Sequence, residues 1–259
     1  GVQTCCSSDL VSLGGRTSGP LMYNAAFYNL SFQGGRRSND LQTLLNTSPL
    51  GLQTNGIAAD SVARLLGILR QLGIPSSVGT PATQRLSDQG SLLGSFDLAP
   101  PQSRSGSAYN LTVNGSWNRT TPVSSLTSEL PSHSGDRTNW NAGAQFRHST
   151  YFGVGVLSET TVGLNGADAT SDPYLLMPSG TVRVNSLFAD GTSSVKSVAF
   201  GGNGALALGT RNTTASFRNL LSWFSEDNKH RIKLTTEVRR DGYAFDQTGN
   251  AYGAFSYNS

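Results

Sequence analysis

Strict alternation of apolar and polar side chains constrains this chain more than any other feature of its sequence. In YNLTVNGSWN, residues 109–118, apolar or small side chains and polar side chains occupy alternate positions. Successive side chains of a β-strand point to opposite faces of the sheet, so this stretch predicts a strand with one apolar and one polar surface. The same split recurs in WNAGAQFRH, residues 140–148, and in IKLTTEVRR, residues 232–240. The sequence therefore predicts an all-β fold.

The alternation predicts eight strands and the layout of their connections. The strands are expected at 22–35, 86–98, 107–120, 138–149, 152–166, 211–225, 229–243 and 250–259. Short turns rich in Pro, Ser, Gly, Asp and Asn alternate with three long loops, 36–85, 121–137 and 167–210. Outer-membrane barrels likewise have short periplasmic turns and long outer loops. We therefore expect an antiparallel up-and-down meander that forms part of a large transmembrane β-barrel.

Further secondary structure is expected inside two of the long loops. In the loop 36–85, ADSVARLLGILRQLGIP repeats its apolar residues with the period of a helix. It predicts one short amphipathic helix that packs on its own loop or on the barrel rim. In the loop 167–210, TVRVNSLFADGTSSVKSVAF predicts a hairpin that turns at Asp190 and Gly191.

The composition is polar without being highly charged. Charged residues make up 14% of the chain, against about 25% in ordinary soluble domains, and the net charge is only +3. No basic cluster is interleaved with aromatic residues, so we expect no nucleic-acid partner. No run of residues approaches the ~20 apolar residues of a membrane-spanning helix. This composition is typical of β-rich extracellular and outer-membrane proteins.

No residue pattern in the sequence indicates catalysis or a cofactor. The three histidines, His133, His148 and His230, lie far apart, and none has a second ligand at metal-binding spacing. SHSGD, residues 132–136, places Ser, His and Asp close together, but catalytic triads are assembled from separate segments of a chain. We therefore expect neither enzymatic activity nor a bound cofactor.

The first ten residues, GVQTCCSSDL, hold both cysteines of the chain side by side. Adjacent cysteines rarely bridge each other, and Cys5 and Cys6 have no partner elsewhere in the sequence. The stretch resembles the conceptual translation of a short-read sequencing adapter. We therefore interpret residues 1–10 as an artefact without ordered contacts, and residues 11–259 as a fragment of an outer-membrane β-barrel domain.

Several longer stretches together resemble one known family. They are YNLSFQGGRRSNDLQTLLN, DSVARLLGIL, DQGSLLGSFDL, NLTVNGSW, TYFGVGVLSET and LSWFSEDNKHRIKLTTEVRRDGY. In strand order and composition they are similar to the barrel of TonB-dependent outer-membrane receptors with an N-terminal carboxypeptidase-regulatory-like domain, often called Oar-like. The resemblance covers most of residues 20–259.

The resemblance implies both a location and a function. Such receptors form barrels of about 22 strands around a plugged lumen, of which this chain would supply roughly a third. It implies the bacterial outer membrane, lipid as a partner, and energy-coupled uptake of a substrate that the sequence does not name. A periplasmic TonB-type protein would act through segments missing from this chain.

An alternative from another class is a soluble secreted β-sandwich or a carbohydrate-binding or adhesion module. Such modules also alternate and are rich in Asn, Ser and Gly. Their strands are usually ~5–6 residues long, whereas membrane-spanning strands need about 9–11. The long alternating stretches of this chain favour the barrel.

The alternation assigns side chains to the two surfaces of the expected barrel wall. The candidates for contact with lipid are Leu111, Val113, Ala144, Phe146, Val154, Val156, Leu221, Leu234 and Val238. The candidates for the aromatic girdles at the membrane interfaces are Tyr109, Trp117, Trp140 and Trp223. The candidates for the lumen are Asn110, Asn114, Gln145, Arg147, Glu159, Lys233, Glu237 and Arg239.

Overall fold

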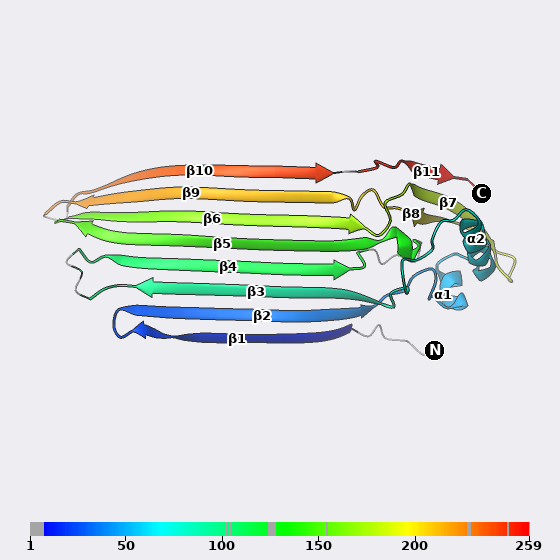
Figure 1. Cartoon of the computed structure of the whole chain (residues 1–259), viewed down its shortest axis with the longest axis horizontal. Coiled ribbons are helices and arrows are strands. Elements are labelled where there is room, and N and C mark those ends of the chain that lie inside the picture. The colour runs from blue at the N-terminus through cyan, green and yellow to red at the C-terminus, as the bar shows by residue number, and fades with distance from the viewer. Residues whose placement is uncertain are drawn as a thin grey trace.

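Eight long strands form one antiparallel sheet in the computed structural model, which describes residues 8–101, 103, 105–123, 128–153, 155–226, 229–247 and 249–258. The strands are β1 (Ser8–Met22), β2 (Ala26–Asp40), β3 (Gln84–Leu98), β4 (Ala108–Thr121), β5 (Gly135–Phe152), β6 (Val156–Pro173), β9 (Leu208–Phe224) and β10 (Arg231–Gln247). Each pairs with the next, and β6 pairs with β9 (Figure 1). The predicted all-β fold and antiparallel meander are confirmed. Neither sheet closes on itself among the described residues.

At the two ends of the chain, the structural predictions for residues 8–10 and for residues 250–259 are wrong. Residues 8–10, expected to lack ordered contacts, begin β1, where Leu10 lies opposite Arg37 of β2. Gly14 and Gly15 interrupt the alternation of β1, which hid this strand in the sequence. Residues 250–259 do not extend the meander, because Ala254–Tyr257 form the short strand β11 of a second sheet. Alternation marks a strand but does not identify the strand beside it. Cys5, Cys6 and Val154 lie outside the described residues.

The connections differ in length at the two ends of the sheet. One end holds the short connections 23–25, 99–107, 153–155 and 225–230. The other end, which we call the cap end, holds the long connections 41–83, 122–134 and 174–207 (Figure 1). These are shorter than the predicted loops because the strands continue beyond their predicted bounds.

The long connections and residues 249–258 fold together into a cap. It contains α1 (Pro49–Thr54), α2 (Ala59–Gln71), the 3₁₀ helix η1 (Pro131–His133), and a sheet of β7 (Ser179–Leu187), β8 (Ser193–Gly201) and β11. The predicted hairpin is confirmed, with Gly191 at φ +81° in its turn. The described residues form two α-helices where the sequence predicted one. The six residues of α1 are too few to display a helical period.

A hydrophobic core lies inside this cap. Its buried side chains are Leu44, Leu52, Ile57, Val62, Leu65, Leu69, Leu130, Val184, Val198 and Phe200. They come from three different long connections. α2 packs on Leu44, Leu52 and Ile57 of its own loop, which confirms that part of the prediction, and also on the β7–β8 hairpin, which the sequence did not predict. Ser61 Oγ on α2 donates a hydrogen bond to the Asn185 carbonyl oxygen of β7 at 2.9 Å. Because the sequence shows the helical period but not the partner, the packing on the hairpin could not be predicted.

Candidate functional site: the two faces of the long sheet

The register of the long sheet assigns its residues to two faces. Directly opposed residues on neighbouring antiparallel strands point to the same side. One row of opposed residues crosses from β3 to β10 as Phe96, Leu111, Phe146, Val162, Phe217 and Val238. We call the side that carries this row the apolar face and the opposite side the polar face.

The register places the predicted site residues consistently on these faces. The apolar face carries Leu111, Val113, Ala144, Phe146, Val156, Leu221, Leu234 and Val238, together with Tyr109, Trp117, Trp140 and Trp223. The polar face carries Asn110, Asn114, Gln145, Arg147, Glu159, Lys233, Glu237 and Arg239. Two of the latter form an ion pair between neighbouring strands, Arg147 with Glu159.

The apolar face is open to the surroundings across the sheet. Leu164 at its centre is 60% exposed, and Val238 on β10 is 62% exposed. Soluble monomers rarely expose a contiguous apolar patch larger than a few hundred Å². Within the described ranges, no second layer of the chain covers these side chains. The exposed apolar face is therefore the largest feature of the long sheet that the packing of the described residues does not explain.

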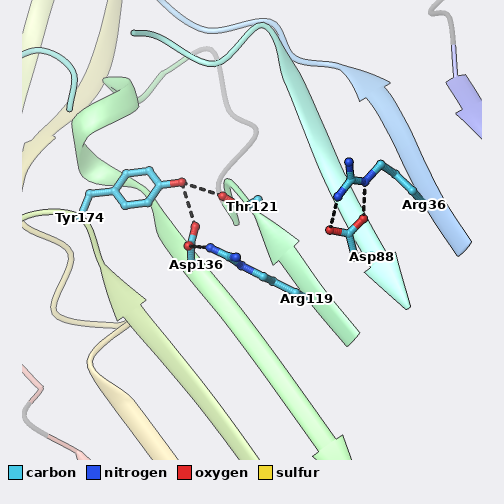
Figure 2. Close-up of polar contacts among 6 residues, drawn as sticks. All are labelled: Arg36, Asp88, Arg119, Thr121, Asp136 and Tyr174. Atoms are coloured by element: carbon cyan, nitrogen blue, oxygen red, sulfur yellow. Dashed lines mark hydrogen bonds and ion pairs between the residues drawn. The ribbon is translucent and has the colours of Figure 1, made fainter. Parts of the chain in front are cut away.

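Ion pairs mark the limit of the apolar face towards the cap end. Arg36 holds Asp88 through two hydrogen bonds, at 2.6 Å from Nε and 3.0 Å from Nη2 (Figure 2). Arg119 Nη2 donates to Asp136 Oδ2 at 2.6 Å, and Arg211 Nε donates to Asp168 Oδ2 at 3.1 Å. We call these three pairs the charged border. Charge on the apolar face thus collects at one end of the strands.

The charged border crosses the strands obliquely. The row that begins at Arg36 on β2 reaches Gly209 on β9 and Asp246 on β10. On β9 the charged residue is Arg211, two residues from Gly209 towards the short turns. On β10 the last arginine before the apolar stretch is Arg240, six residues from Asp246 in the same direction. The limit of the apolar face therefore follows one row from β2 to β4 and lies nearer the short turns on β6, β9 and β10.

Tyr174 ties the cap to the long sheet beside this border. It follows the last residue of β6, and its hydroxyl donates to Asp136 Oδ1 at 3.0 Å. The same hydroxyl lies 3.0 Å from Thr121 Oγ1 at the end of β4 (Figure 2). Burial raises the pKa of Tyr174 above its ordinary value, so the hydroxyl keeps its proton at neutral pH. The network fixes the start of the connection 174–207 against β4 and β5.

The polar face contains a shallow hollow of about 530 Å³. Two neighbouring rows of uncharged side chains line it, and we call it the neutral hollow. The first row is Gln33, Ser91, Ser116, Asn141, Ala167 and Asn212, and the second is Gln89, Asn118, Asn139, Ala169 and Thr210. The residues belong to six strands. The hollow was therefore missed in the sequence, where nothing sets these residues side by side.

Two aromatic side chains on the polar face were also missed. Tyr243 and Phe245 stack with ring centroids 6.3 Å apart and an interplanar angle of 16°. Both are an even number of residues from Lys233 and Glu237 on β10, so they lie on the polar face with them. The sequence does contain a signal for them, because YAF at 243–245 reverses the alternation of the preceding residues.

Comparisons with known proteins add no family to this geometry. No protein-family model matches the chain, and no curated protein matches its sequence. In the part of the chain that the structure describes, no three His, Cys, Asp or Glu side chains gather as metal ligands would. None of the described helices is both long and apolar enough to cross a membrane. The two faces of the long sheet are therefore the features that bear on function.

Proposed function

We propose that the chain forms part of the barrel wall of a TonB-dependent receptor in the bacterial outer membrane. One observation carries the proposal: eight long strands expose a continuous apolar face and present a polar face on the other side. In a transmembrane barrel, lipid covers the outer surface and the interior is polar. The same arrangement in a soluble protein would leave the apolar face in water.

The dimensions of the strands support this proposal. The eight strands are 14 to 18 residues long, whereas about 9–11 residues span a membrane. On β4 the aromatic residues Tyr109 and Trp117 frame the apolar stretch, ~27 Å apart along the strand. At a tilt of ~40°, this separation gives a height of ~20 Å, close to the ~25 Å apolar band of such barrels. The four aromatic residues would then lie at the interfaces as girdles.

A soluble β-sandwich or carbohydrate-binding module fits these observations less well. A sandwich would need a second sheet over the apolar face. The small sheet of β7, β8 and β11 lies at the cap end, and its buried side chains pack with α2 (Figure 1). Strands of 14 to 18 residues also exceed the ~5–6 residues usual in sandwiches.

In the proposed receptor, the parts of the chain have separate tasks. The strands supply wall and lumen lining, and the cap supplies outer loops, since long loops face outward in such barrels. Energy-coupled uptake of a substrate would require a plug and a periplasmic TonB-type partner. Those contacts would be made by segments beyond this sequence.

The fluorescence of the tryptophans tests the proposed contact with lipid. All three tryptophans of the chain, Trp117, Trp140 and Trp223, lie on the apolar face. The chain is diluted from urea into phosphatidylcholine vesicles whose acyl chains carry bromine at a shallow or a deep position. We expect strong quenching, greater with shallow bromine, because girdle residues lie near the headgroups.

A relocated tryptophan provides the control. With the three tryptophans replaced by Phe, Asn114→Trp places a single indole on the polar face. Neither brominated lipid should quench its fluorescence, whereas iodide in the aqueous phase should quench it. Absence of quenching in the original chain, with the protein left in the aqueous phase, would refute the barrel proposal.

A further inference from the structure

The two rows of the neutral hollow end at the stacked aromatic pair. Asn212 of the first row lies opposite Tyr243, and Thr210 of the second row lies opposite Phe245. The rings are open to the surroundings, with Tyr243 68% and Phe245 51% exposed. The stacked rings give the end of the two rows an exposed flat apolar surface on which a ligand can pack. Polar rows and aromatic rings thus form one continuous surface.

Amide side chains dominate the neutral hollow. Six of them line it: Gln33, Gln89, Asn118, Asn139, Asn141 and Asn212. Asn139 Nδ2 donates to Asn118 Oδ1 at 2.9 Å, which orients both groups. An amide offers two donors and two acceptor lone pairs, so this single bond leaves both side chains free to donate and accept further hydrogen bonds. Such groups match ligand hydroxyls, which also donate and accept.

The charge pattern of the polar face favours a neutral ligand in the hollow. Neither row carries a charged side chain at any strand from β1 to β10. Charged side chains lie in the next row on either side. The row nearer the short turns holds Arg16 and Asp241, and the row nearer the cap holds Arg37 and Arg137. Among the described residues that line the hollow, Asp168 alone is charged, and Arg211 binds its carboxylate on the apolar face. A phosphate or carboxylate would therefore meet no cationic side chain within the two rows of the hollow.

The size of the surface suits an extended ligand. A volume of about 530 Å³ falls within the ~300–1,000 Å³ of small-molecule sites. From β2 to β10 the rows cross six strand spacings, ~29 Å in all. Saccharide rings combine hydroxyl edges with apolar C–H faces. The edges fit the amides, and the C–H faces fit flat aromatic rings, which offer apolar surface at the end of the rows.

We propose that the neutral hollow and the Tyr243–Phe245 pair bind a neutral oligosaccharide. This inference names a substrate class for the proposed receptor. It rests on the proposed function, because the polar face lines a lumen only if the sheet is part of a barrel. The amides would hydrogen-bond the hydroxyls of successive sugar rings, and the aromatic pair would stack on a terminal ring. The hollow would thus select uncharged, hydroxyl-rich ligands.

Binding to the lipid-reconstituted chain tests the proposal. The probes are maltohexaose, cellohexaose and xylohexaose, with a neutral Ser/Asn hexapeptide and maltohexaose phosphate for comparison, all measured by calorimetry. We expect saturable binding of at least one neutral hexasaccharide and weaker binding of its phosphorylated form. Tyr243→Ala with Phe245→Ala should weaken binding about tenfold or more, and Asn139→Ala about two- to tenfold.

Tyr151→Ala is the matched control. Tyr151 is an exposed aromatic residue on the polar face of β5, near the short turns and far from the hollow. Its replacement should leave the affinity unchanged. The proposal is overturned if no hexasaccharide binds, if the aromatic and amide variants bind as tightly as the original chain, or if the hexapeptide binds instead.

Tryptophan quenching in the same vesicles separates the two proposals. Quenching without saccharide binding would reject the hollow as a saccharide site and leave the barrel proposal standing. Saccharide binding without quenching would reject the barrel and leave the hollow on a soluble carbohydrate-binding protein. Binding together with quenching supports both.

Discussion

Val113 and Asn114 are neighbours on β4 but face opposite surroundings. Val113 lies on the apolar face, where a Cβ on Gly94 would come within 2.9 Å of Val113 Cγ2, so the glycine leaves room for the valine. Asn114 lies on the polar face. We expect Val113→Arg to cost about 2–4 kcal/mol of folding free energy if the site is near the bilayer midplane, and Asn114→Arg to cost little. Urea titration of the folded chain in vesicles measures both values. Equal tolerance at the two positions would favour the soluble β-sandwich.

At this scale the sequence predicts the faces but not the hollow. The face of each residue follows from the period of two within one strand, which is a local property. That Asn118 lies beside Asn139 depends on the register between β4 and β5. Register is set by pairing across the sheet, and a shift of one residue would separate the two amides. The binding surface therefore becomes visible only in the assembled sheet.

Two glycines of the cap should respond in opposite ways to alanine. A Cβ on Gly202, just after β8, would meet Met177 O at 2.0 Å, which requires the backbone to move. A Cβ on Gly67, exposed on α2, would meet nothing within 4 Å. We expect Gly202→Ala to speed amide hydrogen exchange throughout the cap core. We expect Gly67→Ala to slow exchange in α2, because alanine should raise the local stability of the helix by about 0.5–1 kcal/mol. The same response from both variants would contradict the packing of β8 against residues 175–177.

The Tyr174 hydroxyl should determine how firmly the cap is attached to the long sheet. Tyr174→Phe removes the hydrogen bond to Asp136, while Arg119 keeps its own bond to that carboxylate. We expect a loss of about 1 kcal/mol, seen as faster hydrogen exchange near residues 131–134 and 174–177. Tyr252→Phe, at an exposed tyrosine beside β11, is the control and should change little. Unchanged exchange in Tyr174→Phe would show that the backbone bonds alone attach the cap.

The pH dependence of this anchor follows from the direction of the pKa shift. Burial raises the pKa of Tyr174 in the folded chain, so its contribution is fully present below the ordinary tyrosine pKa of about 10. The contribution should fall as the pH rises through the higher folded value. Hydrogen exchange of the cap, corrected for the intrinsic rate, should therefore increase at strongly alkaline pH in the original chain but less in Tyr174→Phe. Equal alkaline increases in both would assign the effect to other groups.

For the molecule as a whole, the sequence predicts the kind of structure and not its assembly. Seven of the eight expected strands lie in the long sheet, because each of them shows the alternation of apolar and polar side chains within its own sequence. The cap core could not be predicted, since Leu52, Leu130 and Val198 come from three connections and meet only after the sheet has brought those connections to one end. The edge strand β1 was missed because its glycines interrupt the pattern.

The oblique charged border predicts how the strands tilt in a membrane. A boundary between lipid and water is level, so it crosses tilted strands at an angle to their rows of opposed residues. Between β2 and β10 the limit of the apolar face shifts by six residues, from the row of Arg36, which reaches Asp246, to Arg240, and four of these six lie between β9 and β10. This shift is ~20 Å along the strands, over six strand spacings of ~29 Å in all. The ratio gives a tilt of ~35°, within the ~35–45° of outer-membrane barrels. Polarised infrared spectra of oriented bilayers containing the chain should show amide I dichroism for this tilt. Strands parallel to the membrane normal, or lying flat on its surface, would show that the border is not a lipid boundary.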